Sequence, residues 1–86
     1  MAEVLDNYFY VKVFSPFEIF FEGEASALSA VNKSGAFDVL LDHANFISLL
    51  PPGTVRVLTR FGRRDIQINR GILKVSNNRV ILFANV

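Results

Sequence analysis

The feature that most constrains the fold of this chain is a series of short runs of strand-forming residues, each ended by Gly, Pro, Asn or Asp. Residues 54–60 and 64–69 show the clearest alternation of apolar and polar side chains, which is typical of strands with one buried face. No stretch has the period of an amphipathic helix. Such spacing predicts an all-β protein: one small antiparallel β-sandwich or flattened barrel of seven to ten short strands.

Residues 35–53 contain two apolar runs separated by turn-forming residues. Alternation predicts a strand over residues 36–41, and Asp42–Asn45 should end it because Asp and Asn bond their own backbone in turns. The apolar run Phe46–Leu50 follows and stops at Pro51-Pro52-Gly53. We therefore expect a corner made of a buried strand pair joined by a turn that carries His43. Further along, Gly71 should swing the chain to the other sheet, and a hairpin should close across Ser76–Asn78.

Charge is distributed unevenly although the net charge is only +1. Residues 1–50 hold seven acids and two bases, whereas residues 51–86 hold seven bases and one acid. One interpretation is that acidic and basic strands pair or face one another in the sandwich. The other is a basic surface for an acidic partner such as a nucleic acid. Because the bases alternate with apolar residues along strands, the first interpretation is favoured, and no nucleic-acid partner is expected.

Composition also argues against an enzyme. The chain has no cysteine and one histidine, which excludes disulfides, thiolate metal sites and multi-histidine sites. There is no Gly-x-Ser-x-Gly elbow and no phosphate-binding glycine loop, so no catalytic residue, metal or cofactor is predicted. His43 is interpreted as a turn residue whose ring bonds a backbone carbonyl. The longest uncharged run, about residues 43–55, is shorter than the ~20 residues of a membrane span. We expect a soluble single domain, residues 1–86, without a signal sequence.

Aromatic residues are concentrated near the start of the chain. Seven of the eleven Phe and Tyr residues fall between positions 8 and 21. Alternation would place Tyr8, Tyr10 and Phe14 on one face of the first strand and Phe9 on the other. A thin sandwich buries one side of each sheet, so some of these rings should be exposed and meet a partner, unless loops cover them. Residues 80–84 give the same indication, because they are apolar on both faces.

Several segments resemble the amino-terminal domain of the ε subunit of F-type ATP synthases, called δ in mitochondria. Gly35, Phe37, Val39, Leu40, His43 and Ala44 fit that family's Gly-x-[Leu/Phe]-Gly-[Ile/Val]-[Leu/Tyr]-Pro-[Gly/Asn]-His-Ala-Pro block, and Pro52-Gly53 fits the Pro-Gly after it. Asp38, Leu41 and Asn45 depart from the block. Residues 13–23 are similar to the family's first hairpin and residues 71–84 to its last. The resemblance covers roughly residues 8–86 and implies a β-sandwich of about ten strands without the carboxy-terminal helical hairpin.

That resemblance implies a non-catalytic subunit of the central stalk, or rotor. It would dock on the γ subunit and the c-ring and couple proton-driven rotation to ATP synthesis, peripheral to the cytoplasmic face of the bacterial inner membrane. The expected c-ring-facing residues lie in two loops: Asn32, Lys33, Ser34 and Gly35 in the first, and Asp42, His43 and Asn45 in the second. The expected γ-facing residues are Tyr8, Tyr10, Phe20 and Phe83.

Three other functions stay open on the sequence. A stand-alone β-sandwich adaptor that retains the ε fold without a rotor role is the main alternative, since Asp38, Leu41 and Asn45 alter the block. A ligand-binding or nucleic-acid-binding sandwich comes third, because of the basic second half. An enzyme comes last.

Overall fold

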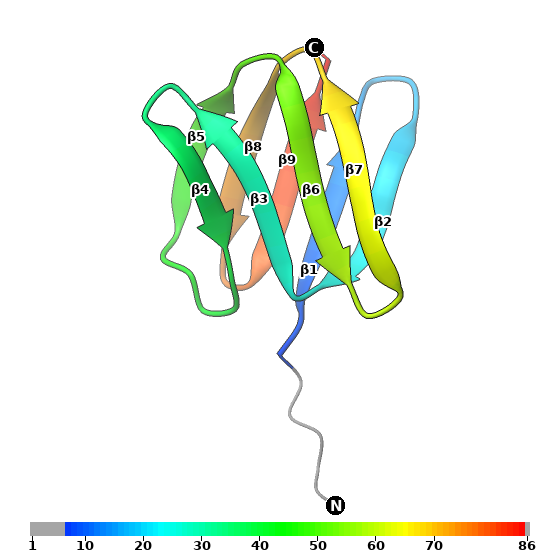
Figure 1. The fold of residues 1–86 in the computed structure, drawn as a ribbon, viewed down its shortest axis with the longest axis vertical. Helices are drawn as coiled ribbons and strands as arrows, with labels where there is room; N and C mark the ends of the chain where they lie inside the picture. Colours follow the sequence, from blue (N-terminus) through cyan, green and yellow to red (C-terminus); the bar gives the residue numbers. More distant parts are fainter. Residues whose placement is uncertain (1–6, 86) are drawn as a thin grey trace, which may run out of the picture.

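A computed structural model describes residues 7–85, and this part of the chain forms nine strands and no helix (Figure 1). The strands are short and follow one another with tight connections, as the turn residues predicted. Their bounds are β1 (Phe9–Phe14), β2 (Ile19–Ala25), β3 (Ala27–Asn32), β4 (Gly35–Val39), β5 (Phe46–Leu50), β6 (Gly53–Thr59), β7 (Gly62–Ile68), β8 (Gly71–Ser76) and β9 (Arg79–Ala84).

The strands form two sheets that stack face to face in a flattened sandwich, which confirms the predicted fold class (Figure 1). The five-stranded sheet has the order β2-β1-β9-β8-β5, and the four-stranded sheet has the order β4-β3-β6-β7. One detail differs from the purely antiparallel arrangement expected: β1 and β9 are parallel. This pair joins strands from the two ends of the chain, and local sequence patterns carry no information on such a pairing.

The core lies between the sheets and is made by the inward residue of each alternating pair. Along β1, Phe9, Val11 and Val13 are buried while Tyr10 and Phe14 face outward, as alternation predicted. β8 and β9 repeat this pattern from the other end of the chain. The buried set contains no polar side chain among the described residues: it consists of Phe9, Val11, Val13, Ala25, Leu28, Ala30, Val39, Leu50, Val55, Val57, Ile66, Ile68, Leu73, Val75, Val80, Leu82 and Ala84.

The corner at residues 35–53 differs from the buried strand pair expected. β4 pairs with β3 in the four-stranded sheet, whereas β5 pairs with β8 in the five-stranded sheet, so the two do not pair with each other. Both are edge strands, and only Val39 and Leu50 of their residues are buried. The prediction of a corner is therefore right and that of a buried pair is wrong. The chain changes sheets here, so neither edge is covered by the other strand.

The turn at this corner has a backbone bond of its own, from the His43 N–H to the Leu40 carbonyl oxygen (3.1 Å), but the side chains of Asp42 and Asn45 bond the β8–β9 turn. We had expected these side chains to bond their own backbone. The Asp42 backbone N–H donates to Oδ1 of Asn78 (2.7 Å), and Nδ2 of Asn78 donates to Oδ1 of Asp42 (3.0 Å). Oδ1 of Asn45 accepts a bond from the backbone N–H of Asn77 (3.0 Å). Asn77 and Asn78 have φ of 51° and 61°, which confirms the predicted tight hairpin.

The connections gather at two ends of the sandwich, which we name by their position in Figure 1. The upper end holds the β1–β2, β3–β4, β5–β6 and β7–β8 connections and the end of β9. The lower end holds the start of β1 and the β4–β5, β6–β7 and β8–β9 connections. The β7–β8 connection carries the chain from one sheet to the other just before Gly71, as predicted.

Candidate interaction surface

The residues expected to face a ring lie at opposite ends of the sandwich. Asn32–Gly35 forms the β3–β4 turn at the upper end, and Asp42–Asn45 belongs to the β4–β5 loop at the lower end (Figure 1). The five-residue strand β4 lies between them. A partner surface at one end of the sandwich would therefore meet one group and not the other.

The residues expected to face the ring from the β4–β5 loop, which we call the lower group, are Asp42, His43 and Asn45. Their side chains make contacts that stabilise the fold. The Asp42 and Asn45 side chains bond the β8–β9 turn, as described above. Nδ1 of His43 lies 2.8 Å from the Ala44 carbonyl oxygen, and its ring packs 4.9 Å from the Phe46 ring, measured between centroids. This confirms the interpretation of His43 as a turn residue bonded to a backbone carbonyl.

The upper group consists of residues Asn32–Gly35 in the β3–β4 turn, and the tip of this turn is accessible to a partner. Oδ1 of Asn32 accepts a bond from the Ser34 backbone N–H (2.8 Å), and Nδ2 of Asn32 donates to Oγ of Ser48 (3.0 Å), which fixes the turn to β5. Lys33, Ser34 and Gly35 are exposed beyond this anchor. Gly35 has φ of 118°, a conformation that favours glycine.

Two of the four residues expected to face γ lie on the outer face of the five-stranded sheet. Tyr10 and Phe83 point outward from β1 and β9, and Phe83 stacks on Phe14 with 4.9 Å between ring centroids. Phe20 instead packs against the core beside the bulge in β2. Tyr8 lies under the guanidinium of Arg60, 4.5 Å from its ring centroid, at the lower end.

The outer face of the five-stranded sheet carries an uninterrupted row of apolar side chains. The register places Phe14 opposite both Ile19 and Phe83, Phe83 opposite Ile72, and Ile72 opposite Leu49. One residue from each strand thus contributes to what we call the apolar row: Ile19, Phe14, Phe83, Ile72 and Leu49. Leu49 is 71% exposed and Ile19 is 56% exposed. A contiguous apolar strip of this kind is characteristic of a binding surface.

Charged side chains border this row. In the next row toward the lower end, Lys12 and Lys74 flank Ile81, with Glu22 and Ile47 at the two edges. Toward the upper end, Arg70 lies two residues before Ile72 on β8. The Tyr10 hydroxyl donates to Glu22, and this bond is the main cause of a raised pKa of Tyr10, so the phenol stays protonated. Cations therefore dominate the middle of this face, and the acids lie on β2.

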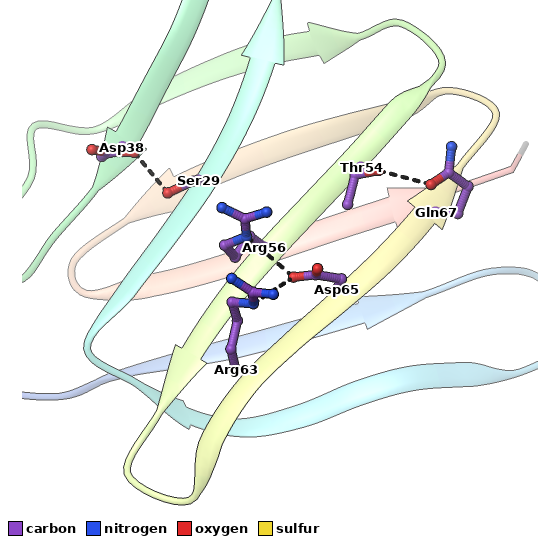
Figure 2. A network of polar contacts seen from close by, with 7 residues as sticks. All are labelled: Ser29, Asp38, Thr54, Arg56, Arg63, Asp65 and Gln67. Carbon is purple, nitrogen blue, oxygen red and sulfur yellow. Dashed lines mark hydrogen bonds and ion pairs between the residues drawn. The ribbon is translucent and has the colours of Figure 1, made fainter.

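The outer face of the four-stranded sheet has a different character (Figure 2). A polar ladder crosses it: Oγ of Ser29 donates to Asp38 (2.7 Å), and Asp65 accepts from Arg56 (3.2 Å). Arg63 adds a second ion pair to Asp65 (3.4 Å), and Thr54 bonds Gln67 (2.7 Å). Val31 and Leu58 are exposed on this sheet, but they lie apart from one another. Polar groups that already bond one another favour a face in contact with water.

Several arginines of the second half are paired with carboxylates. Arg56 and Arg63 meet Asp65, and Arg60 meets Glu24 of β2 (3.2 Å), an acid from the first half of the chain. Arg64 donates to the Phe20 carbonyl oxygen (3.1 Å). The Arg60–Glu24 pair joins the acidic first half to the basic second half, as the first interpretation expected, whereas Arg56 and Arg63 pair with Asp65 inside the second half.

Sequence reasoning missed most of the apolar row. Leu49 was assigned to a buried strand, and Ile19 and Ile72 were not selected at all. A signal existed in β8, where Ile72 and Lys74 alternate with the buried Leu73 and Val75. The row itself depends on the β1–β9 and β5–β8 registers, which join segments far apart in the sequence.

No three His, Asp or Glu side chains in residues 7–85 are arranged to hold a metal ion. The same residues contain no helix long and apolar enough to cross a membrane. The fold and its surfaces thus define a small β-sandwich domain with one polar outer face and one apolar outer face.

A family model described as "ATP synthase, Delta/Epsilon chain, beta-sandwich domain" matches residues 8–86. The chain belongs to this family. An ATP synthase epsilon chain of Clostridium novyi is 32% identical over 78 residues, which is 90% of this chain and 60% of that protein. One from Chlorobaculum tepidum is 35% identical over 78 residues, 90% of this chain and 89% of that protein. The chain thus spans nearly all of some curated relatives and little more than half of others.

Solved structures share the fold at low sequence identity. A chain in the cryo-EM structure of the Euglena gracilis mitochondrial ATP synthase, OSCP/F1/c-ring, superposes with a TM-score of 0.84 at 17% identity, covering 98% of this chain and 54% of that one. A chain of the Tetrahymena thermophila mitochondrial ATP synthase central stalk and c-ring gives 0.78 at 14% identity, covering 90% and 63%. The predicted family resemblance is confirmed.

Proposed function

We propose that this chain is a non-catalytic central-stalk subunit of an F-type ATP synthase. It docks on the γ subunit, contacts the c-ring, and couples proton-driven rotation to ATP synthesis. The observation that carries the proposal is the apolar row on a sandwich of the delta/epsilon family. Relatives named ATP synthase epsilon chain support it. They do not favour a stand-alone adaptor. Its place would be peripheral, at the cytoplasmic face of the bacterial membrane.

The γ subunit is assigned to the outer face of the five-stranded sheet. Burial of exposed apolar side chains is the main favourable term in protein association, and the apolar row offers such side chains in one strip. The four-stranded sheet offers bonded polar groups, whose transfer from water brings little gain. We include Tyr10 and Phe83 in this proposed interface and leave out Tyr8, which lies beside Arg60, and Phe20, which packs against the core.

Leu49→Asp is expected to weaken the complex with γ by about a hundredfold or more, because it puts a charge into an apolar contact. Leu49 is exposed, so the substitution should leave the domain folded. Thr54→Asp, on the polar outer face, is the matched control and should bind γ like the wild type. Affinities from titration calorimetry would test this. If both variants weakened the affinity for γ equally, the assignment of γ to the outer face of the five-stranded sheet would be wrong.

The c-ring is assigned to the upper end, through Lys33, Ser34 and Gly35. These three residues are exposed, and they lie beyond the Asn32 anchor at the tip of the turn. The residues of the lower group are already engaged in contacts that fix the β4–β5 loop. We therefore keep the first of the two expected loops as ring-facing and give the second a structural role.

Disulfide cross-linking can separate the two ends. A cysteine at position 33 should cross-link to cysteines introduced in the polar loops of the c-ring within the assembled synthase. A cysteine at Ala44, exposed at the lower end, should not. Because the protein contains no native cysteine, each product reports one position. Cross-linking from position 44 alone would reverse the orientation.

A further inference from the structure

The shape of the apolar row restricts the element that can cover it. The row is one residue deep along the strands and five strands long. With strands about 4.8 Å apart, its length from Ile19 to Leu49 is about 19 Å. The neighbouring outward row, which contains Lys12 and Lys74, lies about 6.7 Å away along the strands. The partner must therefore bring a long, narrow apolar ridge.

Strand addition does not fit this shape, since a strand adds to the edge of a sheet and the row lies on its face. A second sheet packed face to face would align with the strands to within about 30°. It would then bury the charged row together with the apolar one. A single α-helix laid along the row has a suitable diameter of about 10 Å with its side chains. It could cover the row while its flanks stay beside the charged groups.

The charges define the flanks of that helix. Lys12 and Lys74 border the row on one side, and on the other side Arg70 lines a surface hollow together with Leu49 and Ile72. Nζ of Lys12 lies 5.0 Å from the Phe14 ring centroid, so this cation sits at the margin of the row itself. Complementary charge steers association and selects partners. A helix with carboxylates on both sides of its apolar stripe is complementary to this arrangement.

We propose that the apolar row binds one amphipathic helical segment of the γ subunit, about 13 residues long, with acidic side chains flanking its apolar stripe. The length follows from 19 Å at 1.5 Å per residue. This inference rests on the proposed function, because it names the element of γ that occupies the same face. The helix lies across the strands and contacts all five of them.

Photo-cross-linking measures the geometry directly. A benzoylphenylalanine at position 19, 72 or 49 is assembled with γ, and the attached γ residues are identified by mass spectrometry. If a helix lies along the row, the γ residues cross-linked from positions 72 and 49 should be about three residues apart in the γ sequence. Those cross-linked from positions 19 and 49 should be about 13 residues apart. A crossing strand would give about six for the second pair. The same probe at Thr54, on the polar face, should give no γ product.

The outcomes separate the two levels of the proposal. If the γ residues cross-linked from positions 19, 72 and 49 lie in distant γ segments, or are spaced as in a strand, the proposed helix is wrong but γ still docks on this face. Products from position 54 with none from the row would overturn the face assignment as well. A folded chain that forms no complex with γ would overturn both.

The charge component has its own test. Lys74→Glu should weaken γ binding about tenfold at low salt and less at high salt, as expected for flanking ion pairs. Lys33→Glu, at the upper end away from the row, is the matched control and should leave γ binding unchanged. Equal effects of the two variants would overturn the assignment of acidic flanks. Flotation of the free chain with phosphatidylglycerol vesicles, abolished by Leu49→Asp and unaffected by added γ, would assign the row to lipid and overturn the proposal.

Discussion

Replacing Leu82 by alanine is expected to lower the free energy of unfolding by about 2–5 kcal/mol, the range for large-to-small changes in a packed core. Leu82 is completely buried in β9, the middle strand of the five-stranded sheet, which pairs with both β1 and β8. Its loss leaves a cavity between the sheets. For a domain of this size, with a total stability of about 5–15 kcal/mol, this is a large fraction. Urea unfolding followed by circular dichroism measures it.

Ile81→Ala is the matched control for Leu82→Ala. Ile81 is the next residue of the same strand, but it points outward between Lys12 and Lys74 and is only partly covered. Its truncation should cost clearly less than that of Leu82. A loss of unfolding free energy below about 1 kcal/mol for Leu82→Ala, or equal losses for the two variants, would contradict the assignment of Leu82 to the inner face of β9 and Ile81 to its outer face.

Gly71→Ala is the second substitution with a large expected effect. A Cβ at position 71 would lie 2.8 Å from Cδ1 of Leu82 and 3.2 Å from the Phe83 carbonyl oxygen. Both neighbours belong to β9, and Leu82 is enclosed on all sides. Overpacking of this kind costs about 1–3 kcal/mol. Gly71 is thus required by close approach of β9, at the point where the chain enters the five-stranded sheet.

A double-mutant cycle tests that explanation. If the cost of Gly71→Ala comes from contact with Leu82, it should fall in a Leu82→Ala background, because the methyl group then occupies vacated space. Gly53→Ala serves as the control, since the atom closest to a Cβ there is 4.0 Å away and no left-handed φ is needed. Additive effects of the first pair would show that the backbone carbonyl of Phe83, and not Leu82, causes the strain.

The elements of this fold could largely be predicted from the sequence, because each depends on local information. Alternation defines β6 and β7, and the asparagines of the β8–β9 turn accept the left-handed conformation that the hairpin needs. The face division of β1 also follows from alternation alone. These features need no knowledge of which strand pairs with which.

The arrangement of the corner could not be predicted in the same way. Phe46–Leu50 has the composition of a buried strand, yet Ile47 and Leu49 point outward, because alternate residues of β5 face opposite sides and its sheet has only one covered face. Asp42 and Asn45 have the composition of a self-contained turn, yet they bond Asn77 and Asn78. In both cases the deciding partner lies more than 20 residues away.

The interaction surface shows the same limit more clearly. Aromatic clustering indicated outward-facing rings on β1, and Tyr10 and Phe14 are on that face, where they are partly buried. The apolar row as a unit appears only when β1 and β9 are paired in parallel and β5 is placed beside β8. The two loops expected to face the ring were assigned through the family resemblance, yet β4 lies between them and they are at opposite ends of the sandwich.

The central claim is that this sandwich is a stalk subunit that docks on γ. Its most direct test is gel filtration of the wild-type chain mixed with γ from the same organism, at low and at moderate salt, to see whether the two proteins co-elute. We predict a one-to-one complex that persists at moderate salt, since apolar contacts are not screened as ion pairs are. Separate elution of the two folded proteins at both salt concentrations would contradict the claim and leave only the shared fold.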